Sequence, residues 1–413
     1  MLRKVLLGMC VVLLVESYAT AQNAPVERPT NYDFTTILNS KRDRLEPTRC
    51  AAMNSQGTVA VQVRDPALGI NKLITKGAAN DAPVVIADTR SIPDLPTFCD
   101  NGMTAIPSDP TINELGEVAF QGNLRRLTTR AECGTTEQRA RRQGVFLGSG
   151  GPLTTIAHTI NQPGGDFISE FLVADQSVND AGNVAIIPEL DLTFDQGLFV
   201  GSKQGNIEKR FLVSEGQFGG VSSRVSLNEV GQVAFQTTLQ GPFPRTQGIF
   251  LSNPDGSFKT IADSTGEIAS FDAPSLNNSG TVAFLGSKFV NGIQVLGIFA
   301  SNGGPVSTVV DSTGPFASFR EPSFNDFGEV AFTADLDEFG PGGVPIQGVF
   351  TGDDPKRDLV LQTGDKYDGE RVTSITTCSE ALNNNGEIVM TVQSQDPKTF
   401  EVLTFIVKAT PKN

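Results

Sequence analysis

The sequence has a single histidine, His158, and none of the residue spacings that mark common catalytic or cofactor sites. No Cys/His set has zinc-site spacing, and a serine, histidine and aspartate triad would have to use His158, at the end of a predicted outer strand. Neither a glycine-rich phosphate loop nor a Gly-x-Ser-x-Gly turn occurs. The sequence therefore predicts no cofactor and gives only weak support for an enzyme.

Positive charge and long apolar runs are also scarce. The chain has 46 acidic against 32 basic residues, a formal charge of −14, which argues against nucleic-acid binding and favours solubility. Arg3 and Lys4 precede an apolar run, residues 5–15, that is shorter than the roughly 20 residues of a membrane span. With the small residues before Ala21, this run predicts a signal peptide, 1–21, and a secreted or periplasmic protein without a membrane span. The alternative is an uncleaved anchor.

A turn motif, Asn-x-x-Gly, marks seven repeats along the chain. Asn caps a type I turn through its side chain, and Gly takes the left-handed conformation at the fourth position, so each pair predicts a tight hairpin. The spacing is near 49 residues, with insertions. The structural turns are Asn54 with Gly57, Asn113 with Gly116, Asn179 with Gly182, Asn228 with Gly231, Asn277 with Gly280, Asn325 with Gly328 and Asn383 with Gly386.

Each repeat contains four short apolar segments, which predicts an all-β, seven-bladed β-propeller with four-stranded blades. One segment precedes the turn, and the others have the forms Val-Ala-Phe, Gly-Ile-Phe and Thr-Ile-Ala-Asp. The last repeat lacks its fourth segment, and the N-terminal stretch Phe34–Leu38 resembles the missing one. We therefore expect this strand to complete the last blade and close a single domain, residues 34–410, after a flexible lead-in, 22–33. The segment before each turn should be innermost.

The repeated pattern resembles that of a bacterial family of exported and surface proteins named for its NxxGxxAF tandem repeat. The resemblance covers nearly the whole chain after the signal peptide and implies no particular reaction. Three repeats depart from the pattern because Val61, Ile186 and Met390 replace the phenylalanine.

The long insertions, 89–104, 121–143, 187–196 and 333–347, all fall on the face of the ring opposite the Asn-x-x-Gly turns, and we call this the long-loop face. Long loops on a rigid scaffold commonly carry binding sites. One insertion is strongly basic, which suggests a site for an anion or an acidic partner, because guanidinium groups bind carboxylate and phosphate in pairs. The alternative is a solvated loop that balances an acidic protein. Its arginines are Arg125, Arg126, Arg130, Arg139, Arg141 and Arg142.

Two acidic stretches could gather Ca²⁺, although neither follows the EF-hand pattern, and ordinary surface charge is the alternative. They contain Glu189, Asp191 and Asp195, and Asp335, Asp337 and Glu338.

Four cysteines remain after residue 21, and an even number in an exported chain makes disulfides plausible. Their places in the ring predict the pairs Cys50 with Cys378, across the closure, and Cys99 with Cys133, between neighbouring blades. The alternative is four reduced, buried thiols.

The sequence as a whole predicts a monomeric, exported binding scaffold whose partner is an unidentified protein or glycan. The alternatives are a propeller enzyme, such as a carboxylate-dependent glycoside hydrolase or lyase, and a purely structural surface or matrix component. Loss of turnover on removing a channel carboxylate would indicate the enzyme, and saturable binding without turnover would indicate the scaffold.

Overall fold

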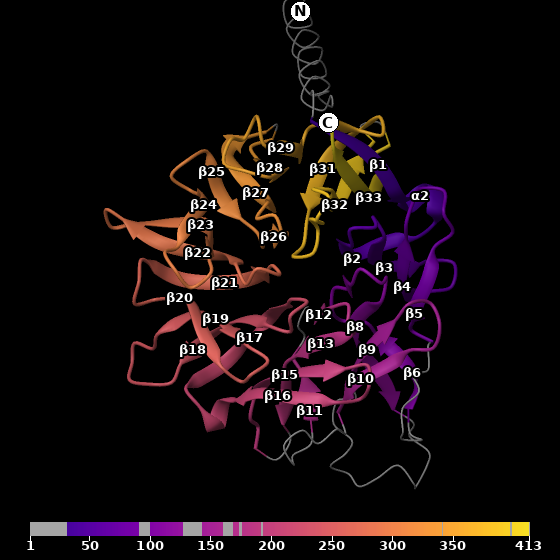
Figure 1. Cartoon of the computed structure of the whole chain (residues 1–413). Coiled ribbons are helices and arrows are strands. Elements are labelled where there is room, and N and C mark those ends of the chain that lie inside the picture. The colour runs from indigo at the N-terminus through magenta and orange to yellow at the C-terminus, as the bar shows by residue number, and fades with distance from the viewer. Residues whose placement is uncertain are drawn as a thin grey trace, which may run out of the picture.

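The computed structural model describes residues 31–90, 100–126, 143–159, 168–172, 176–190, 193–340, 342–396 and 399–412. Seven antiparallel sheets stand side by side around a central channel (Figure 1). The chain is therefore a seven-bladed β-propeller with four-stranded blades, which confirms the predicted fold.

In each blade the chain runs outward from an inner strand, and in blade seven the outermost strand is the N-terminal one. Blades one to three consist of β2 (Glu46–Met53), β3 (Val59–Asp65), β4 (Ile70–Lys76) and β5 (Val84–Asp88); β6 (Asp100–Ala105), β7 (Thr111–Ile112), β8 (Val118–Arg126), β9 (Gln143–Gly148) and β10 (Thr154–His158); and β12 (Ser177–Val178), β13 (Asn183–Ile186), β15 (Gly197–Ser202) and β16 (Ile207–Leu212). The short pair β11 (Ile168–Phe171) and β14 (Pro188–Leu190) extends blade three, and a 3-10 turn, η3 (Val213–Glu215), follows it.

Blades four to seven follow the same order. They consist of β17 (Phe218–Leu227), β18 (Val233–Leu239), β19 (Gln247–Ser252) and β20 (Phe258–Asp263); β21 (Ile268–Leu276), β22 (Val282–Val290), β23 (Ile293–Ser301) and β24 (Ser307–Asp311); β25 (Phe316–Phe319), β26 (Ser323–Phe324), β27 (Val330–Phe339), β28 (Pro345–Phe350) and β29 (Leu359–Gln362); and β30 (Lys366–Tyr367), β31 (Glu370–Thr376), β32 (Ile388–Gln395), β33 (Val402–Pro411) and the N-terminal β1 (Tyr32–Asn39). A four-residue helix, α2 (Ser40–Asp43), leads from β1 into blade one.

The N-terminal strand closes the ring. β1 is the outermost strand of blade seven and pairs with β33 from Tyr32 opposite Pro411 to Asn39 opposite Phe405. The strand begins two residues earlier than the predicted Phe34, because Tyr32 and Asp33 also pair with the end of the chain.

The inner strands are longer and more irregular than the sequence suggested, so the crossovers between blades are shorter. In blade five, for example, the inner strand is already paired at Ile268, and a bulge at Ala273, with φ of 46°, bends the strand before Pro274. Blades two and six divide the same strand into two pieces around Pro110 and Pro322, because proline has no N–H to donate to the ladder.

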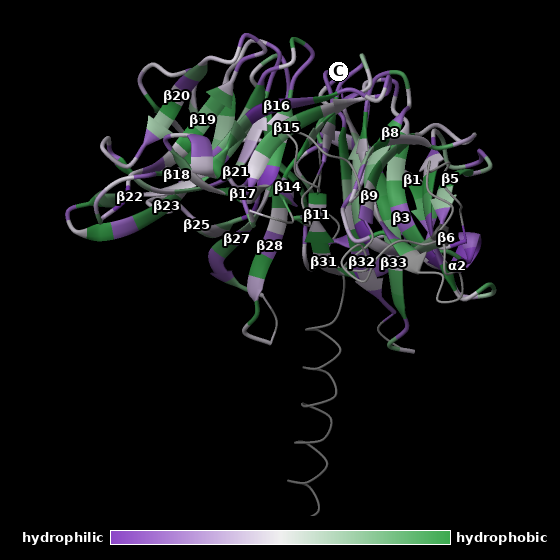
Figure 2. Cartoon of the chain, turned by 90° about the horizontal axis from the view of Figure 1, so that it is seen from below, coloured by the Kyte–Doolittle hydropathy of each residue, from purple (hydrophilic) through white to green (hydrophobic). Residues whose placement is uncertain are grey.

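The core lies between neighbouring sheets. The second strand of each blade is apolar on both faces, and the side chains of Val282, Ala283 and Phe284 are completely buried. Val61, Ile186 and Met390 are also buried where they replace the phenylalanine. Figure 2 shows this apolar material running along the strands of the ring. Among the described residues, no helix is long and apolar enough to cross a membrane.

All four predicted loop insertions contain strand residues, since β6 begins at Asp100 within 89–104 and β14 (Pro188–Leu190) lies within 187–196. β8 continues to Arg126, and β27 and β28 extend the blade-six hairpin to Phe339 and from Pro345. Paired strands satisfy the backbone hydrogen bonds that a free loop would leave to water.

Candidate functional site

The seven Asn-x-x-Gly turns form a continuous belt of hydrogen bonds around the channel. Each Asn Oδ1 accepts from the backbone N–H four residues on at 2.8–3.0 Å. Each Asn Nδ2 also donates to the backbone carbonyl of the equivalent Asn in the next blade at 3.0–3.3 Å, and Asn383 returns to Asn54. One side chain therefore caps its own turn and links two blades.

The residues that follow these asparagines form a second closed belt. The backbone N–H of each one donates to the side chain of its counterpart in the next blade, at 2.8–3.4 Å. Four of the seven acceptors are carboxylates, so the belt surrounds this end of the channel with negative charge. The members are Ser55, Glu114, Asp180, Glu229, Asn278, Asp326 and Asn384.

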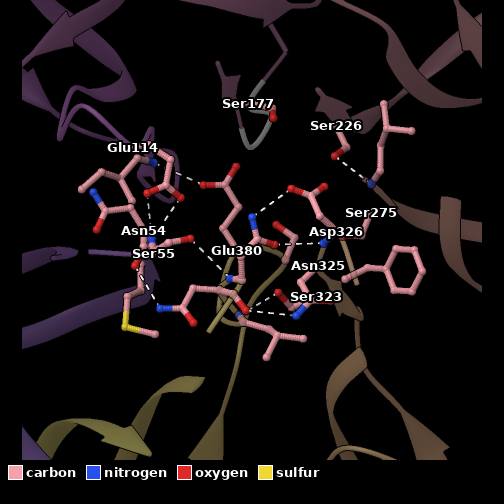
Figure 3. A pocket seen from close by; sticks show the side chains of 18 of the residues that line it. Asn54, Ser55, Glu114, Ser177, Ser226, Ser275, Ser323, Asn325, Asp326 and Glu380 are labelled. Atoms are coloured by element: carbon pink, nitrogen blue, oxygen red, sulfur yellow. Dashed lines mark hydrogen bonds between the residues drawn. The ribbon is translucent and has the colours of Figure 1, made fainter. Parts of the chain in front are cut away.

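A pocket of about 160 Å³ lies inside these belts, between the inner strands (Figure 3). We call it the channel pocket. Carboxylates, hydroxyls and amides line it together with a layer of apolar side chains, and among the described residues its lining includes no Lys, Arg, His or Tyr. The polar lining includes Glu114, Asp326, Glu380, Ser177, Ser226, Ser275, Ser323, Ser379, Asn54 and Asn384.

The seven turn glycines shape the belts but do not belong to the channel pocket. Their φ angles lie between 73° and 82°, and each backbone N–H donates to the carbonyl of its own Asn at 2.9–3.2 Å, as in a type I turn. None of them is part of the pocket lining, since glycine has no side chain that could reach a ligand there. They are Gly57, Gly116, Gly182, Gly231, Gly280, Gly328 and Gly386. Their part in the site is therefore to hold the asparagines in place.

Glu380 enters the pocket because the inner strand of blade seven is interrupted. The Ala381 amide donates to the Cys378 carbonyl in a turn, and only a single bridge, Leu382 to Ile388, continues the sheet. Glu380 Oε2 then accepts from the Ile112 amide of blade two at 3.2 Å. This side chain therefore lies across the channel.

A row of serines lies just beneath the belts. Ser177, Ser226 and Ser323 each accept a backbone N–H of the next blade at 2.9–3.0 Å. Ser275 stands at the equivalent place in blade five, is 5% exposed and lines the pocket. Within the described part of the chain, its hydroxyl has no hydrogen-bond partner, so it is available to a ligand.

Burial and neighbouring negative charges raise the pKa of one carboxylate of the belt, Glu229. Burial raises the pKa of Glu229 above its ordinary value, and the charges of Asp180 and Glu114 raise it further. The hydrogen bond from the Asp180 amide acts in the opposite direction. The belt therefore gains negative charge as the pH rises through the raised pKa.

Two positive charges of the inner strands lie farther from the turns and are paired. Arg224 of blade four and Glu321 of blade six are 2.6 Å apart, and Arg49 of blade one and Asp109 of blade two are 3.7 Å apart. These pairs leave the pocket itself acidic.

The structure describes only two of the six arginines predicted to bind an anion or acidic partner, and only their backbones. The backbones of Arg125 and Arg126 end β8, whereas Arg130, Arg139, Arg141 and Arg142 lie outside the described residues. The predicted arginine site therefore stays a prediction. The acidic belt was readable in the sequence, since an acidic residue follows Asn in four turns, but the position of Glu380 depends on the irregular blade seven.

Two residues of the predicted acidic stretches make local contacts. Asp195 accepts from the Ser214 amide and hydroxyl, and Asp335 accepts from Ser318 Oγ at 2.7 Å. Asp191 lies outside the described residues. The described chain has one cluster with metal-ligand spacing, Cys50, Asp109 and Cys378. Its cysteines are bonded to each other and have no thiolate to offer a metal.

The predicted disulfide across the closure is present. Cys50 in β2 and Cys378 in the blade-seven turn are joined, with Cα atoms 5.9 Å apart. Cys378 follows β31 rather than lying in an inner strand as expected, because the chain turns there. Cys99 and Cys133 lie outside the described residues. His158 is buried at the end of β10.

Comparison with known proteins identifies one matching protein family and several solved structures with a similar fold. The sequence pattern of a protein family described as a family of unknown function (DUF7453) matches residues 53–402. No curated protein matches the sequence. Oligogalacturonate lyase from Vibrio parahaemolyticus is similar in structure, with 12% identity, 94% of this chain and 98% of that chain covered, and a TM-score of 0.51. A polysaccharide lyase, Uly1, has 10% identity, coverage of 89% and 90%, and a TM-score of 0.50. At these identities the likeness shows the fold alone.

Proposed function

Because this chain belongs to DUF7453, a family of unknown function, we propose its function from the channel itself. We propose an exported propeller that binds, without turnover, a ligand carrying an ammonium or guanidinium group in the channel pocket. Its ligand would be a polyamine or a basic side chain of a partner protein.

The acidic, cation-free lining of the pocket carries this proposal. Glu114, Asp326 and Glu380 present carboxylates, and Ser275 presents a free hydroxyl, within a space of about 160 Å³. Hydrogen bonds between charged donors and carboxylates are shorter and stronger than neutral ones. The space suits one extended cationic group, and the same charges would repel an acidic sugar polymer.

Export is supported by the disulfide as well as by the N-terminal sequence. Disulfides persist in oxidising compartments and are rare in the cytosol, and Cys50 and Cys378 are joined in this protein. The likeness to the NxxGxxAF family remains a prediction from the repeat pattern.

An enzyme is the second candidate, and one observation favours it. Glu380 and Glu114 line the same pocket from different blades, and two carboxylates can act as acid and base on a glycosidic bond. Turnover of a neutral oligosaccharide that is lost in Glu380→Gln would establish this function instead.

Calorimetric titration of the purified protein with spermidine and with a lysine-rich peptide tests the binding proposal. We expect saturable binding that is weakened by salt, and an affinity about tenfold lower for Glu380→Gln, since hydrogen bonds to charged groups contribute about 1.5–3 kcal/mol. Glu338→Gln removes the same charge from the long-loop face and should leave the affinity unchanged. Affinity should rise with pH as the belt ionises, because the pKa of Glu229 is raised.

The contrary outcome is equally clear. If an oligogalacturonate binds and spermidine does not, or if Glu380→Gln binds spermidine like the unchanged protein, the channel pocket is not a cation site.

A further inference from the structure

Exposed phenylalanines stand on the hairpins that join the second and third strands of five consecutive blades. They are Phe194, Phe243, Phe289, Phe339 and Phe400, with exposed fractions between 63% and 93%. Phe194, Phe243 and Phe400 lie between β14 and β15, β18 and β19, and β32 and β33, whereas Phe289 and Phe339 lie at the ends of β22 and β27, where the chain turns into β23 and β28. We call them the phenylalanine tips.

All five tips lie on the long-loop face. The Asn-x-x-Gly turn joins the first and second strands at one face, and antiparallel pairing returns the second strand to the opposite face. The connection to the third strand is therefore on the same face in every blade. In Figure 2 the β27–β28 hairpin hangs from this side of the ring. One connection, that of blade two, lies outside the described residues and is not part of this surface.

Neither packing nor backbone geometry accounts for phenylalanine at these places. Side chains so exposed contribute little to the core. Phe194 and Phe400 also have φ of 53° and 59°, in the left-handed region that bulky residues avoid. Glycine or asparagine would adopt this conformation with less strain. Phenylalanine at these places therefore exposes apolar surface to water and, at Phe194 and Phe400, strains the backbone. Both are expected when the side chain contacts something outside the molecule.

We propose that the phenylalanine tips dock this face of the propeller on a zwitterionic lipid surface. The tips come from separate blades around the ring, so a deformable surface can adapt to several of them where a rigid partner could not. Phenylalanine has no hydrogen-bonding atom, so the tips suit apolar insertion and lack the donors and acceptors that orient a sugar.

The charges beside the tips favour a zwitterionic surface over an anionic one. Arg245 lies two residues after Phe243, and Glu338 directly precedes Phe339, so the tips present both signs of charge. The formal charge of −14 opposes adsorption to anionic lipid. Headgroups that carry both an ammonium and a phosphate match this mixture. This docking does not depend on ligand binding in the channel pocket.

The chain contains no tryptophan, so a single introduced one reports its own surroundings. We would compare Phe243→Trp with Phe327→Trp, an exposed phenylalanine at an Asn-x-x-Gly turn on the opposite face. With phosphatidylcholine vesicles, the emission of Phe243→Trp should shift to shorter wavelength and be quenched by brominated lipid. Phe327→Trp should show neither change. A shift in Phe327→Trp alone would overturn the proposal.

Co-sedimentation with the same vesicles measures the contribution of the tips. Replacing Phe243, Phe289, Phe339 and Phe400 by serine should lower the partition coefficient about threefold to tenfold for each residue removed. A variant with Leu115, Val230 and Phe327 replaced by serine has lost exposed apolar side chains from the other face only, and should partition like the unchanged protein.

Three results would overturn lipid docking. One is equal vesicle binding by the serine variant, and another is binding only to vesicles that contain phosphatidylglycerol. The third is a dimer in sedimentation velocity that the serine substitutions dissociate, without vesicle binding. That result would make the tips a contact between two copies of this chain.

Discussion

At the scale of single residues, asparagine has two roles that only its amide can combine. In Asn277, Oδ1 accepts the Thr281 amide at 3.0 Å, while Nδ2 donates to the Asn325 carbonyl of the next blade at 3.3 Å. Ionised aspartate could cap the turn but has no hydrogen to donate to the next blade. The repeat therefore keeps asparagine for the contact between blades as well as for the turn.

Replacing Asn277 by alanine should remove both hydrogen bonds. We expect the free energy of unfolding, measured by chemical denaturation, to fall by about 2–3 kcal/mol, since the neighbouring carbonyl is left buried and unpaired. Asn253→Ala is the control, because Asn253 begins a further Asn-x-x-Gly turn, between β19 and β20, whose two side-chain hydrogen bonds, to Ser257 and from Gln232, stay within blade four. A loss as large in the control would show that the contact between blades contributes little.

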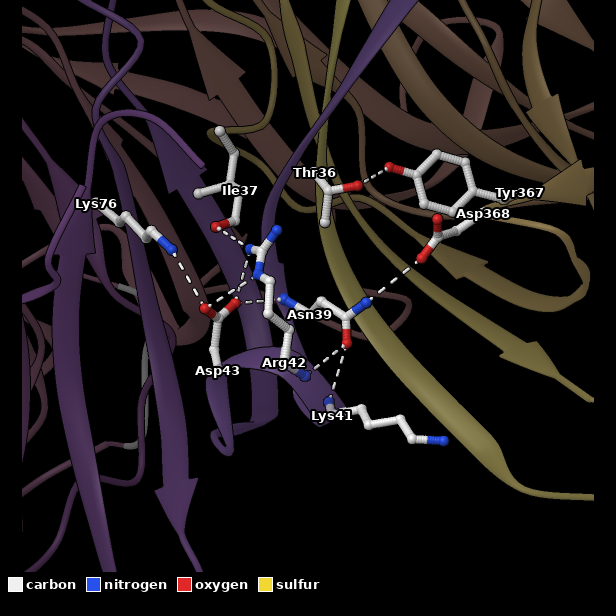
Figure 4. A network of polar contacts seen from close by, with 9 residues as sticks. All are labelled: Thr36, Ile37, Asn39, Lys41, Arg42, Asp43, Lys76, Tyr367 and Asp368. Atoms are coloured by element: carbon white, nitrogen blue, oxygen red, sulfur yellow. Dashed lines mark hydrogen bonds and ion pairs between the residues drawn. The ribbon is translucent and has the colours of Figure 1, made fainter. Parts of the chain in front are cut away.

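At the scale of elements, the link from β1 through α2 to blade one is a polar network (Figure 4). Asn39 caps α2 by accepting from the Lys41 and Arg42 amides at 3.0 and 3.1 Å. Asp43 accepts from Arg42 at 2.8 Å and lies 3.7 Å from Lys76, a lysine of β4 whose side chain is 4% exposed. The network therefore ties the closing strand to the first blade.

Burial alone would favour neutral Asp43, but hydrogen bonds from Arg42 and the Asn39 amide outweigh it and lower its pKa. The stabilisation by Asp43 is therefore complete above about pH 4 and is lost as the pH falls through the lowered pKa. Asp43→Asn should cost about 3 kcal/mol at neutral pH because Lys76 loses its buried partner.

Chemical denaturation of Asp43→Asn between about pH 2 and 7 tests this pH dependence. The difference in free energy of unfolding between the variant and the unchanged protein should shrink below about pH 4. Asp33→Asn, on the closing strand β1 that leads into α2, removes an exposed partner of Lys412 and should change stability by less than about 1 kcal/mol. A difference that stays constant at acid pH would exclude the ionic role of Asp43.

At the scale of the whole molecule, the two ends of the chain meet at one seam. β1 pairs with β33 there, Tyr367 Oη and Thr36 Oγ1 are 2.5 Å apart, and the disulfide joins residues 328 positions apart. The two belts of hydrogen bonds also pass through the seam, from Asn383 to Asn54 and from Asn384 to Ser55. A closed ring of this kind should unfold as a unit.

Replacing Cys50 and Cys378 together by serine should lower stability by about 4–5 kcal/mol, because a loop of this length loses much conformational entropy when closed. Denaturant unfolding should remain a single transition if β1 still closes the ring. Two separate transitions would show that the disulfide holds together blades that otherwise unfold independently. Asp43→Asn in the same background should cost more than in the oxidised protein, since both changes weaken one seam.

The sequence by itself determined the repeating unit, the number of blades and the closing strand. Turns and strands are selected by local interactions, and the same Asn-x-x-Gly turn occurs in each of the seven repeats. It also predicted the Cys50 to Cys378 bond, since the order of the blades brings the first and last repeats together. Only the tertiary structure decided what faces the channel. Glu380 enters the pocket from an irregular turn, and the residues after each asparagine become one belt only when seven blades meet.

The same limit holds for the long-loop face. Phe194 and Phe400 belong to no motif in the sequence, and their shared exposure on one side of the ring follows from the direction of seven antiparallel sheets. Local interactions select each turn and strand, whereas a surface built from different blades exists only after ring closure has fixed how the blades stand to one another.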